Sequence, residues 1–241
     1  MKLLAFELAT EACSVALMMD GALIVRHEIA PRRHVALALP WADALLAEAG
    51  LAKSQIDALA VGIGPGAFTG VRLAISLVQG MALGLDRPVL PVSTLAALAE
   101  PFLKQGPVLA AIDARMGELY VGEFQADAAG LPRSVCDEVL LPMATASEIL
   151  HKRWGAESPR RIAVGTGFAA SGGEWWQVLG AQLRHVVPEA LPTASAVARI
   201  AARDFAAGRV LRPDDLQPTY LRDKVALTSA EQAAARAAKL R

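Results

Sequence analysis

The sequence predicts an α/β fold made of two related domains, each a mixed β-sheet flanked by helices. An apolar strand ending in an acidic residue, then a turn, a returning strand and a second turn, occurs twice, once with Glu7 and once with Asp113. Between these two copies, residues 56–84 read as strand, glycine-rich loop and helix, the order typical of α/β units. The halves share this plan though few residues, which indicates an internal duplication.

The composition sets limits on the function. The 241 residues include 24 basic and 24 acidic side chains, so the whole-chain charge gives no sign of a free-standing nucleic-acid binder. Although 54% of the residues are apolar, the longest apolar runs are interrupted and fall short of the ~20 residues of a membrane span. The start of the chain does not resemble a signal peptide. We therefore expect a cytoplasmic protein without a membrane segment that covers apolar surface in an oligomer.

The first half is expected to open with three strands, the second and third joined by a hairpin turn at Asp20 and Gly21. A helix closed by Gly50 follows, and Thr69 is the expected N-cap of a second helix ending near Gly84. The expected strands are residues 3–8, 14–18, 22–29, 56–61 and 88–92. The expected helices are residues 35–49, 70–84 and 94–99.

The second half begins after a break at residues 101–107. A capping box at Thr145 and Glu148 predicts one helix, and Thr193 is the expected N-cap of another. The expected strands are residues 108–113, 118–124 and 161–164, and the helices are residues 145–154 and 194–207. This gives a first domain of residues 1–104 completed by 193–222, a second, smaller domain of 105–192, and a frayed or disordered tail of 223–241.

The glycine loop at residues 62–72 has two interpretations. A strand, glycine loop and helix can present backbone amides to an anion. However, Gly70 is followed by Val71 and Arg72 rather than by Lys and Ser or Thr, and no third glycine completes a dinucleotide motif. A tight turn that starts a helix is therefore the favoured interpretation.

The acidic strand ends also leave two alternatives open. Glu7 either faces a cleft at the carboxyl end of its strand, or is a carboxylate bonded to the Thr10 hydroxyl or to nearby amides. The loop at residues 165–167 is a second weak anion-binding candidate. The candidate cleft residues, for a weak nucleotide or anion site, are Glu7, Thr10, Gly66, Asp113, Gly165 and Gly167.

The two long helices of the first half both lack a clean polar face. Arg72 is the only charge between residues 71 and 85, and Ser76, Gly80 and Gly84 form a smooth ridge at intervals of four. Glycine in a helix interior costs about 1 kcal/mol against alanine, so the ridge indicates close backbone packing. Either both helices lie within the core, or they form a partner interface, which is favoured. The expected interface residues are His34, Leu37, Trp41, Leu45, Arg72, Ser76, Gly80 and Leu83.

A strand-end acidic residue in each half, facing a cleft between two related domains, resembles the actin, sugar-kinase and heat-shock chaperone (ASKHA) superfamily. Four blocks narrow this resemblance to the bacterial TsaB (YeaZ-type) family. They are LAFELATEACSVAL at residues 4–17, GPGAFTGVR at 64–72, AIDARMGE at 111–118 and PTYLR at 218–222. One departure is Glu7, where that family usually has Asp.

The resemblance implies a subunit of the complex that adds a threonylcarbamoyl group to N6 of adenosine 37 in tRNAs reading codons that start with adenine. In that family the transfer is done by a paralogous subunit, TsaD, which binds a metal through His-x-x-x-His. Thr94 and Leu98 stand at those two positions here, and neither can ligate a transition metal. We therefore expect no metal site, no catalytic residue and no enzymatic activity of its own.

The same resemblance implies the partners. They are TsaD, an ATPase subunit TsaE, tRNA bound through the complex rather than alone, and a second copy of the chain when TsaD is absent. No cofactor is expected, apart from ATP or ADP at the complex interface. The alternative function is an ATP-dependent phosphotransferase or ATPase of the ASKHA superfamily acting on its own, with Glu7, Asp113 and the two glycine loops in its site.

Overall fold

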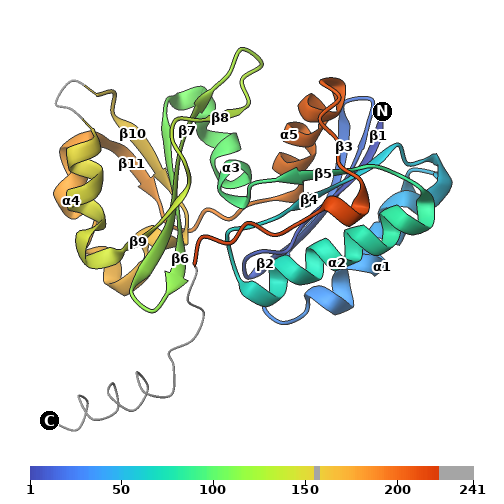
Figure 1. Ribbon diagram of the computed structural model, residues 1–241, viewed down its shortest axis with the longest axis horizontal. Helices are drawn as coiled ribbons and strands as arrows, with labels where there is room; N and C mark the ends of the chain where they lie inside the picture. Colours follow the sequence, from blue (N-terminus) through green and yellow to red (C-terminus); the bar gives the residue numbers. More distant parts are fainter. Residues whose placement is uncertain (155–157, 223–241) are drawn as a thin grey trace, which may run out of the picture.

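The chain forms two mixed β-sheets with helices on their faces, in a computed structural model that describes residues 1–154 and 158–222 (Figure 1). The first sheet contains β1 (Lys2–Glu7), β2 (Ala12–Met19), β3 (Ala22–Ile29), β4 (Ala58–Gly62) and β5 (Val89–Val92). The second contains β6 (Val108–Arg115), β7 (Glu118–Ala126), β8 (Pro132–Ser134), β9 (Val139–Pro142), β10 (Arg161–Val164) and β11 (Leu183–Val187). The α-helices are α1 (His34–Glu48), α2 (Phe68–Leu85), α3 (Thr94–Ala99), α4 (Met143–Arg153) and α5 (Ala194–Ala206).

The two sheets repeat one topology. Their strand orders are β3-β2-β1-β4-β5 and β8-β7-β6-β10-β11, with β9 also paired to β7. In each sheet the central strand pairs antiparallel with the next strand in sequence, β1 with β2 and β6 with β7. On its other side it pairs with a parallel strand, β4 or β10. The duplicated α/β fold predicted from the sequence is confirmed.

The helices and sheets alternate in layers (Figure 1). Helices α1 and α2 cover one face of the first sheet through a core that includes Phe6 and Leu59. Helix α5 covers its other face, and α3 packs on β6 of the second sheet, whose far face carries α4. A single apolar cluster, containing Leu3 and Val108, joins the inner faces of both sheets through α3 and α5. The two halves therefore share one core layer.

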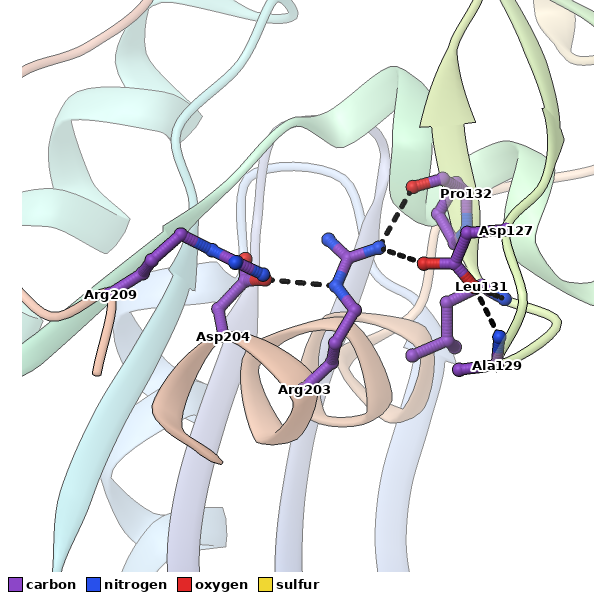
Figure 2. Close-up of polar contacts among 7 residues, drawn as sticks. All are labelled: Asp127, Ala129, Leu131, Pro132, Arg203, Asp204 and Arg209. Atoms are coloured by element: carbon purple, nitrogen blue, oxygen red, sulfur yellow. Dashed lines mark hydrogen bonds and ion pairs between the residues drawn. The ribbon is translucent and has the colours of Figure 1, made fainter. Parts of the chain in front are cut away.

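Polar contacts reinforce this junction (Figure 2). Arg203 on α5 donates through Nη1 to Asp127 Oδ2 (2.9 Å), on the turn after β7, and to the carbonyl of Pro132 (3.0 Å), the first residue of β8. Its Nε donates to Asp204 Oδ1 (2.9 Å). Arg199, one turn earlier, forms a two-point pair with Glu100 (2.7 and 2.6 Å). Helix α5 thus ties the hairpin of the second sheet to the first half of the chain.

Helix α2 begins earlier than the sequence pattern predicts. Its N-cap is Ala67, not Thr69, and Thr69 lies within the first turn. The amide of Ala67 donates to the carbonyl of Ala9 (2.7 Å), which fixes the start of the helix against the turn after β1. By length and composition α2 could also cross a membrane, with 28% of its residues buried. Five of its side chains, however, pack on the first sheet as in a core helix: Val71, Ala74, Ile75, Val78 and Ala82.

Three strands were not predicted, because β8, β9 and β11 are short and each carries few apolar residues in alternation. Helix α4 starts at Met143 with Pro142 as its N-cap, so the capping box expected at Thr145 is wrong. The expected cap of α5, Thr193, is confirmed, since its side chain accepts an amide hydrogen bond. Ser93 caps α3 in the same way. The tail predicted for residues 223–241 lies outside the described residues.

Candidate functional site

A cleft of about 1200 Å³ opens at the carboxyl ends of the central strands. Its walls come from the turn after β1, the start of α2, the end of β6 and residues 219–222. Parallel strands of an α/β sheet commonly place binding sites at this end. Of the residues expected in a cleft, Thr10, Gly66 and Asp113 line it.

Glu7 does not face this cleft. Its side chain is fully buried, and it accepts hydrogen bonds from the amide of Ala9 (2.8 Å) and the hydroxyl of Thr94 (3.2 Å). Burial raises the pKa of Glu7 to about 7, against the lowering effect of these hydrogen bonds. The alternative of a carboxylate bonded to nearby amides is therefore the correct one, although Thr94 rather than Thr10 supplies the hydroxyl.

The length of Glu7 is matched by Gly62 on the neighbouring strand. A Cβ at position 62 would lie 1.9 Å from Glu7 Oε2. Thr94 Oγ1, which donates to Glu7, itself accepts a hydrogen bond from the amide of Gly64 (3.1 Å). The carboxyl group thus joins β1, the glycine loop and α3 beneath the cleft.

Asp113 lies at the cleft wall but already has a cation of its own chain. Its Oδ1 accepts from the amide of Arg115 (2.8 Å) and its Oδ2 from the Arg115 guanidinium (2.7 Å). Arg222 donates to the carbonyl of Ala114 (3.0 Å) and to Glu118 (2.5 Å). These contacts hold residues near the C-terminal end of the described chain against the strand that carries Asp113.

The glycines of both loops serve close packing of backbone on backbone. A Cβ at Gly66 would lie 2.5 Å from the carbonyl oxygen of Ala9, and one at Gly70 would lie 2.1 Å from that of Leu8. In the second loop, a Cβ at Gly165 would lie 2.3 Å from the carbonyl of Ala111, and Gly167 meets the same residue. The amides of Gly64 and Gly165 donate within the chain. The interpretation of the first loop as a tight turn agrees with this geometry.

The outer faces of α1 and α2 form an apolar surface. Among the residues predicted for it, Arg72, Ser76, Gly80 and Leu83 are exposed, while His34, Leu37 and Trp41 are half-buried. Leu45 is fully buried against the sheet, so its assignment to a partner surface is wrong. A Cβ at Gly80 or Gly84 would meet no atom within 4 Å. The close packing that this ridge predicts does not occur within the described part of the chain.

Three exposed apolar side chains of α1 and α2 were not among the interface residues predicted from the sequence. Val35 is 71% exposed, and Leu39 and Phe68 are also exposed. Val35 and Leu39 lie four residues apart, the spacing of one helix face. We define the helix-pair surface by Val35, Leu39, Ser76, Gly80 and Leu83.

Arg72 links this surface to the cleft. Its guanidinium lies 3.4 Å from the centre of the Phe68 ring, and its Nε donates to the Tyr220 hydroxyl (2.8 Å). The amide of Thr219 donates to the carbonyl of Ile63 (2.9 Å). His34, at the start of α1, bonds through Nε2 to the carbonyls of Thr10 and Ala12. Arg72 and His34, two of the expected interface residues, therefore also hold the glycine loop, α1 and residues 218–222 together.

Thr94 and Leu98, which stand where the resemblance places two metal ligands, lie on α3 and face the protein core. Both are buried, and the Thr94 hydroxyl is engaged with Glu7. Within residues 1–154 and 158–222, no group of three or more His, Cys, Asp or Glu side chains is arranged to hold a metal ion.

Comparisons with known proteins agree with this architecture. Residues 25–175 match the family model described as TsaD, tRNA N6-adenosine threonylcarbamoyltransferase. The chain is 41% identical to the tRNA threonylcarbamoyladenosine biosynthesis protein TsaB of Escherichia coli (strain K12), over 94% of this chain and 96% of that protein. It is 34% identical to the TsaB protein of Haemophilus influenzae, over 92% and 94%. Among solved structures, YeaZ from Pseudomonas aeruginosa is 39% identical with a TM-score of 0.79, covering 91% of this chain and 99% of that chain.

Proposed function

Because this chain belongs to the TsaB family of tRNA threonylcarbamoyladenosine biosynthesis proteins, we propose that it is a non-catalytic, activating subunit of the complex that makes this modification. Its task is to bind the paralogous catalytic subunit, TsaD, which transfers the threonylcarbamoyl group to N6 of adenosine 37. The match to the TsaD family model supports a common origin of the two subunits.

The observation that carries this proposal is the helix-pair surface. Val35 and Leu39 on α1 and Leu83 on α2 are large apolar side chains left exposed, and Ser76 and Gly80 add a ridge of small residues on α2. Exposed apolar side chains gathered on two neighbouring helices mark a protein contact. The small residues let another helix approach α2 closely. A paralogue of the same fold presents the complementary pair of helices, and a second copy of this chain can occupy the surface when TsaD is absent.

The cleft supports the non-catalytic part of the proposal. Glu7 is buried away from it, Asp113 is paired with Arg115, and the loop glycines pack on backbone rather than around an anion. An ATP-dependent phosphotransferase would need a carboxylate free to hold Mg²⁺ or a reacting group at this place. That alternative is therefore not favoured.

The proposed complex also includes an ATPase subunit, a nucleotide and the tRNA substrate. An ATPase subunit, TsaE, joins the pair, and ATP or ADP is bound at the complex interface rather than by this chain alone. The tRNA is engaged by the assembled complex, in the cytoplasm.

The substitution Gly80→Arg tests the proposed interface. We expect the variant to fold, because a Cβ at this position meets no atom within 4 Å. We also expect its association with the catalytic subunit to weaken at least tenfold, because a long charged side chain must then be desolvated in an apolar contact. Association is measured by calorimetry with the catalytic subunit from the same cell, and modification by reconstituted tRNA threonylcarbamoylation.

Gly180→Arg is the matched control. Gly180 is also exposed with open space at its Cβ, but it lies in the second half, away from α1 and α2. It should leave both association and modification unchanged. Undiminished association of Gly80→Arg would overturn the proposed interface, and full modification of tRNA without this chain would overturn the proposed function.

A further inference from the structure

Positive side chains gather around the start of β11. His151 Nδ1, at the end of α4, lies 2.9 Å from Gln182 Oε1. The carbonyl of Leu183 accepts from Arg160 Nε (3.0 Å) and Nη2 (2.5 Å). Arg184 Nη1 donates to the carbonyl of Gln105 (2.6 Å), the residue after Lys104. Three consecutive residues of the chain, 182–184, therefore contact three segments that each carry a cation or an imidazole. We define the basic cluster as Lys104, His151, Lys152, Arg160 and Arg184.

The charges of this cluster are largely uncompensated. All five side chains are exposed. Within residues 1–154 and 158–222, the acidic partner within ion-pair distance of any of them is Glu148, 2.7 Å from Lys152. Arg160 and Arg184 are held by main-chain carbonyls instead, which fix the guanidinium group without neutralising it. The chain as a whole is neutral, so this local excess of positive charge is invisible in the composition.

The cluster lies at the opposite end of the second sheet from the cleft. Its members surround the amino ends of β10 and β11, whereas Thr166 and Pro188, which follow these strands, line the cleft. In Figure 1 the upper end of α4 and the starts of β10 and β11 lie together, far from α1 and α2. The basic cluster and the helix-pair surface therefore lie on different halves of the fold.

We propose that the basic cluster contacts the phosphate backbone of the tRNA substrate, an inference that rests on the proposed function. Arg and Lys are the residues that bind phosphate most often, and the free energy of such contacts comes largely from counterion release. Because these contacts go to phosphates, they strengthen binding without reading sequence.

The test compares two triple variants of the full chain with equal loss of charge. The cluster variant is Lys104→Gln, Lys152→Gln and Arg184→Gln. The matched control is Lys53→Gln, Arg87→Gln and Arg212→Gln. Lys53 and Arg87 lie in the first half of the chain, and Arg212 lies near the end of the described residues. Arg87, like Arg184, is bonded to main-chain carbonyls. Each variant, and the wild type, is assembled with the catalytic subunit. Binding of an unmodified transcript of a tRNA that reads a codon starting with adenine is then measured by fluorescence polarisation over a series of salt concentrations. Thermal unfolding confirms that both variants are folded.

We expect the cluster variant to bind the transcript at least about tenfold more weakly than the control at low salt, with a slope of log K against log salt that is smaller by about two to three. Arg184→Lys, which keeps the charge, should retain the affinity. Equal affinity and equal slope in the two triple variants, or the absence of salt-dependent binding by the wild type, would overturn the inference. Loss of binding to polyglutamate with unchanged tRNA binding would show that the cluster serves an acidic protein, and would also overturn it. None of these outcomes depends on the modification assay, which tests the proposed function separately.

Discussion

Replacing Glu123 by alanine is expected to destabilise the folded chain by about 3–5 kcal/mol, because it leaves the buried Arg161 guanidinium without its counter-charge. Glu123, on β7, is 3% exposed. Its Oε2 accepts from Arg161 Nε (3.1 Å) and Trp154 Nε1 (2.7 Å), and its Oε1 accepts from Arg153 Nη1 (3.2 Å). Arg161 also lies 4.0 Å from the centre of the Trp154 ring. One carboxylate therefore holds α4 and β10 together on the outer side of the second sheet.

The size of this effect follows from burial rather than from the ion pair as such. The i,i+4 pair of Glu148 and Lys152 on α4 has a similar distance but side chains 66% and 74% exposed. Glu148→Gln is the matched control and should change stability by no more than about 0.5 kcal/mol. The double variant Glu123→Leu/Arg161→Met should be more stable than Glu123→Leu alone, because it removes both buried charges instead of one.

Urea denaturation followed by circular dichroism measures these differences. The apolar cluster shared by both sheets favours a single unfolding transition, so one midpoint is expected. A Glu123→Ala variant within about 1 kcal/mol of the wild type would show that Arg161 finds another partner or water, contrary to the mechanism of an unpaired buried charge. A double variant no more stable than Glu123→Leu would contradict it as well.

The order of strands and helices in the first half could be read from the sequence because each element carries its own signal. The segments around Leu4, Val15 and Leu59 are apolar and bounded by turn residues, and Ser93 and Thr193 are strong caps. The repeated acidic strand end at Glu7 and Asp113 was enough to indicate the duplication. By contrast, β8 and β11 depend on pairing with β7 and β10, and such long-range pairing leaves little trace in a short, mixed segment.

The surfaces were harder to predict than the fold. The scarcity of charges on α1 and α2 indicated an interface, but the side of each helix that faces the sheet depends on the tertiary structure. Leu45 and Leu46 face inward with Ala38 and Ala42, whereas Val35 and Leu39 do not. The basic cluster draws its members from four segments between residues 104 and 184, so no local pattern could show it.

The departure at Glu7 could be seen in the sequence, but its meaning could not. A longer carboxyl side chain could equally have extended into the cleft. The structure instead places it over Gly62, within reach of both the Ala9 amide and the Thr94 hydroxyl. The residue at position 94 therefore serves a buried hydrogen-bond network here. Glu7 and Thr94 form one structural unit beneath the glycine loop.

Glu7 makes the stability of the chain depend on pH in an unusual direction. Its pKa is raised from the ordinary value of 4.5 to about 7, chiefly by burial. The folded chain therefore binds this proton more tightly than the unfolded chain, and the carboxyl's contribution to stability falls as the pH rises from about 4.5 to about 7. At about 1.4 kcal/mol for each pKa unit, the loss above that window is about 3 kcal/mol.

Glu7→Gln should remove this dependence. The amide mimics the protonated carboxyl, since its oxygen can accept from the Ala9 amide. Its nitrogen can donate to Thr94 Oγ1 once the Thr94 hydroxyl, which donates to the ionised Glu7, turns to another acceptor. Relative to the wild type, we expect the variant to be about equally stable near pH 4 and about 2–3 kcal/mol more stable near pH 8. Glu11→Gln, an exposed carboxylate on the same turn, should show no such difference. If Glu7→Gln is less stable than the wild type at the higher pH, the buried group is a stabilising carboxylate, and the ionised form is the one that holds the glycine loop to α3.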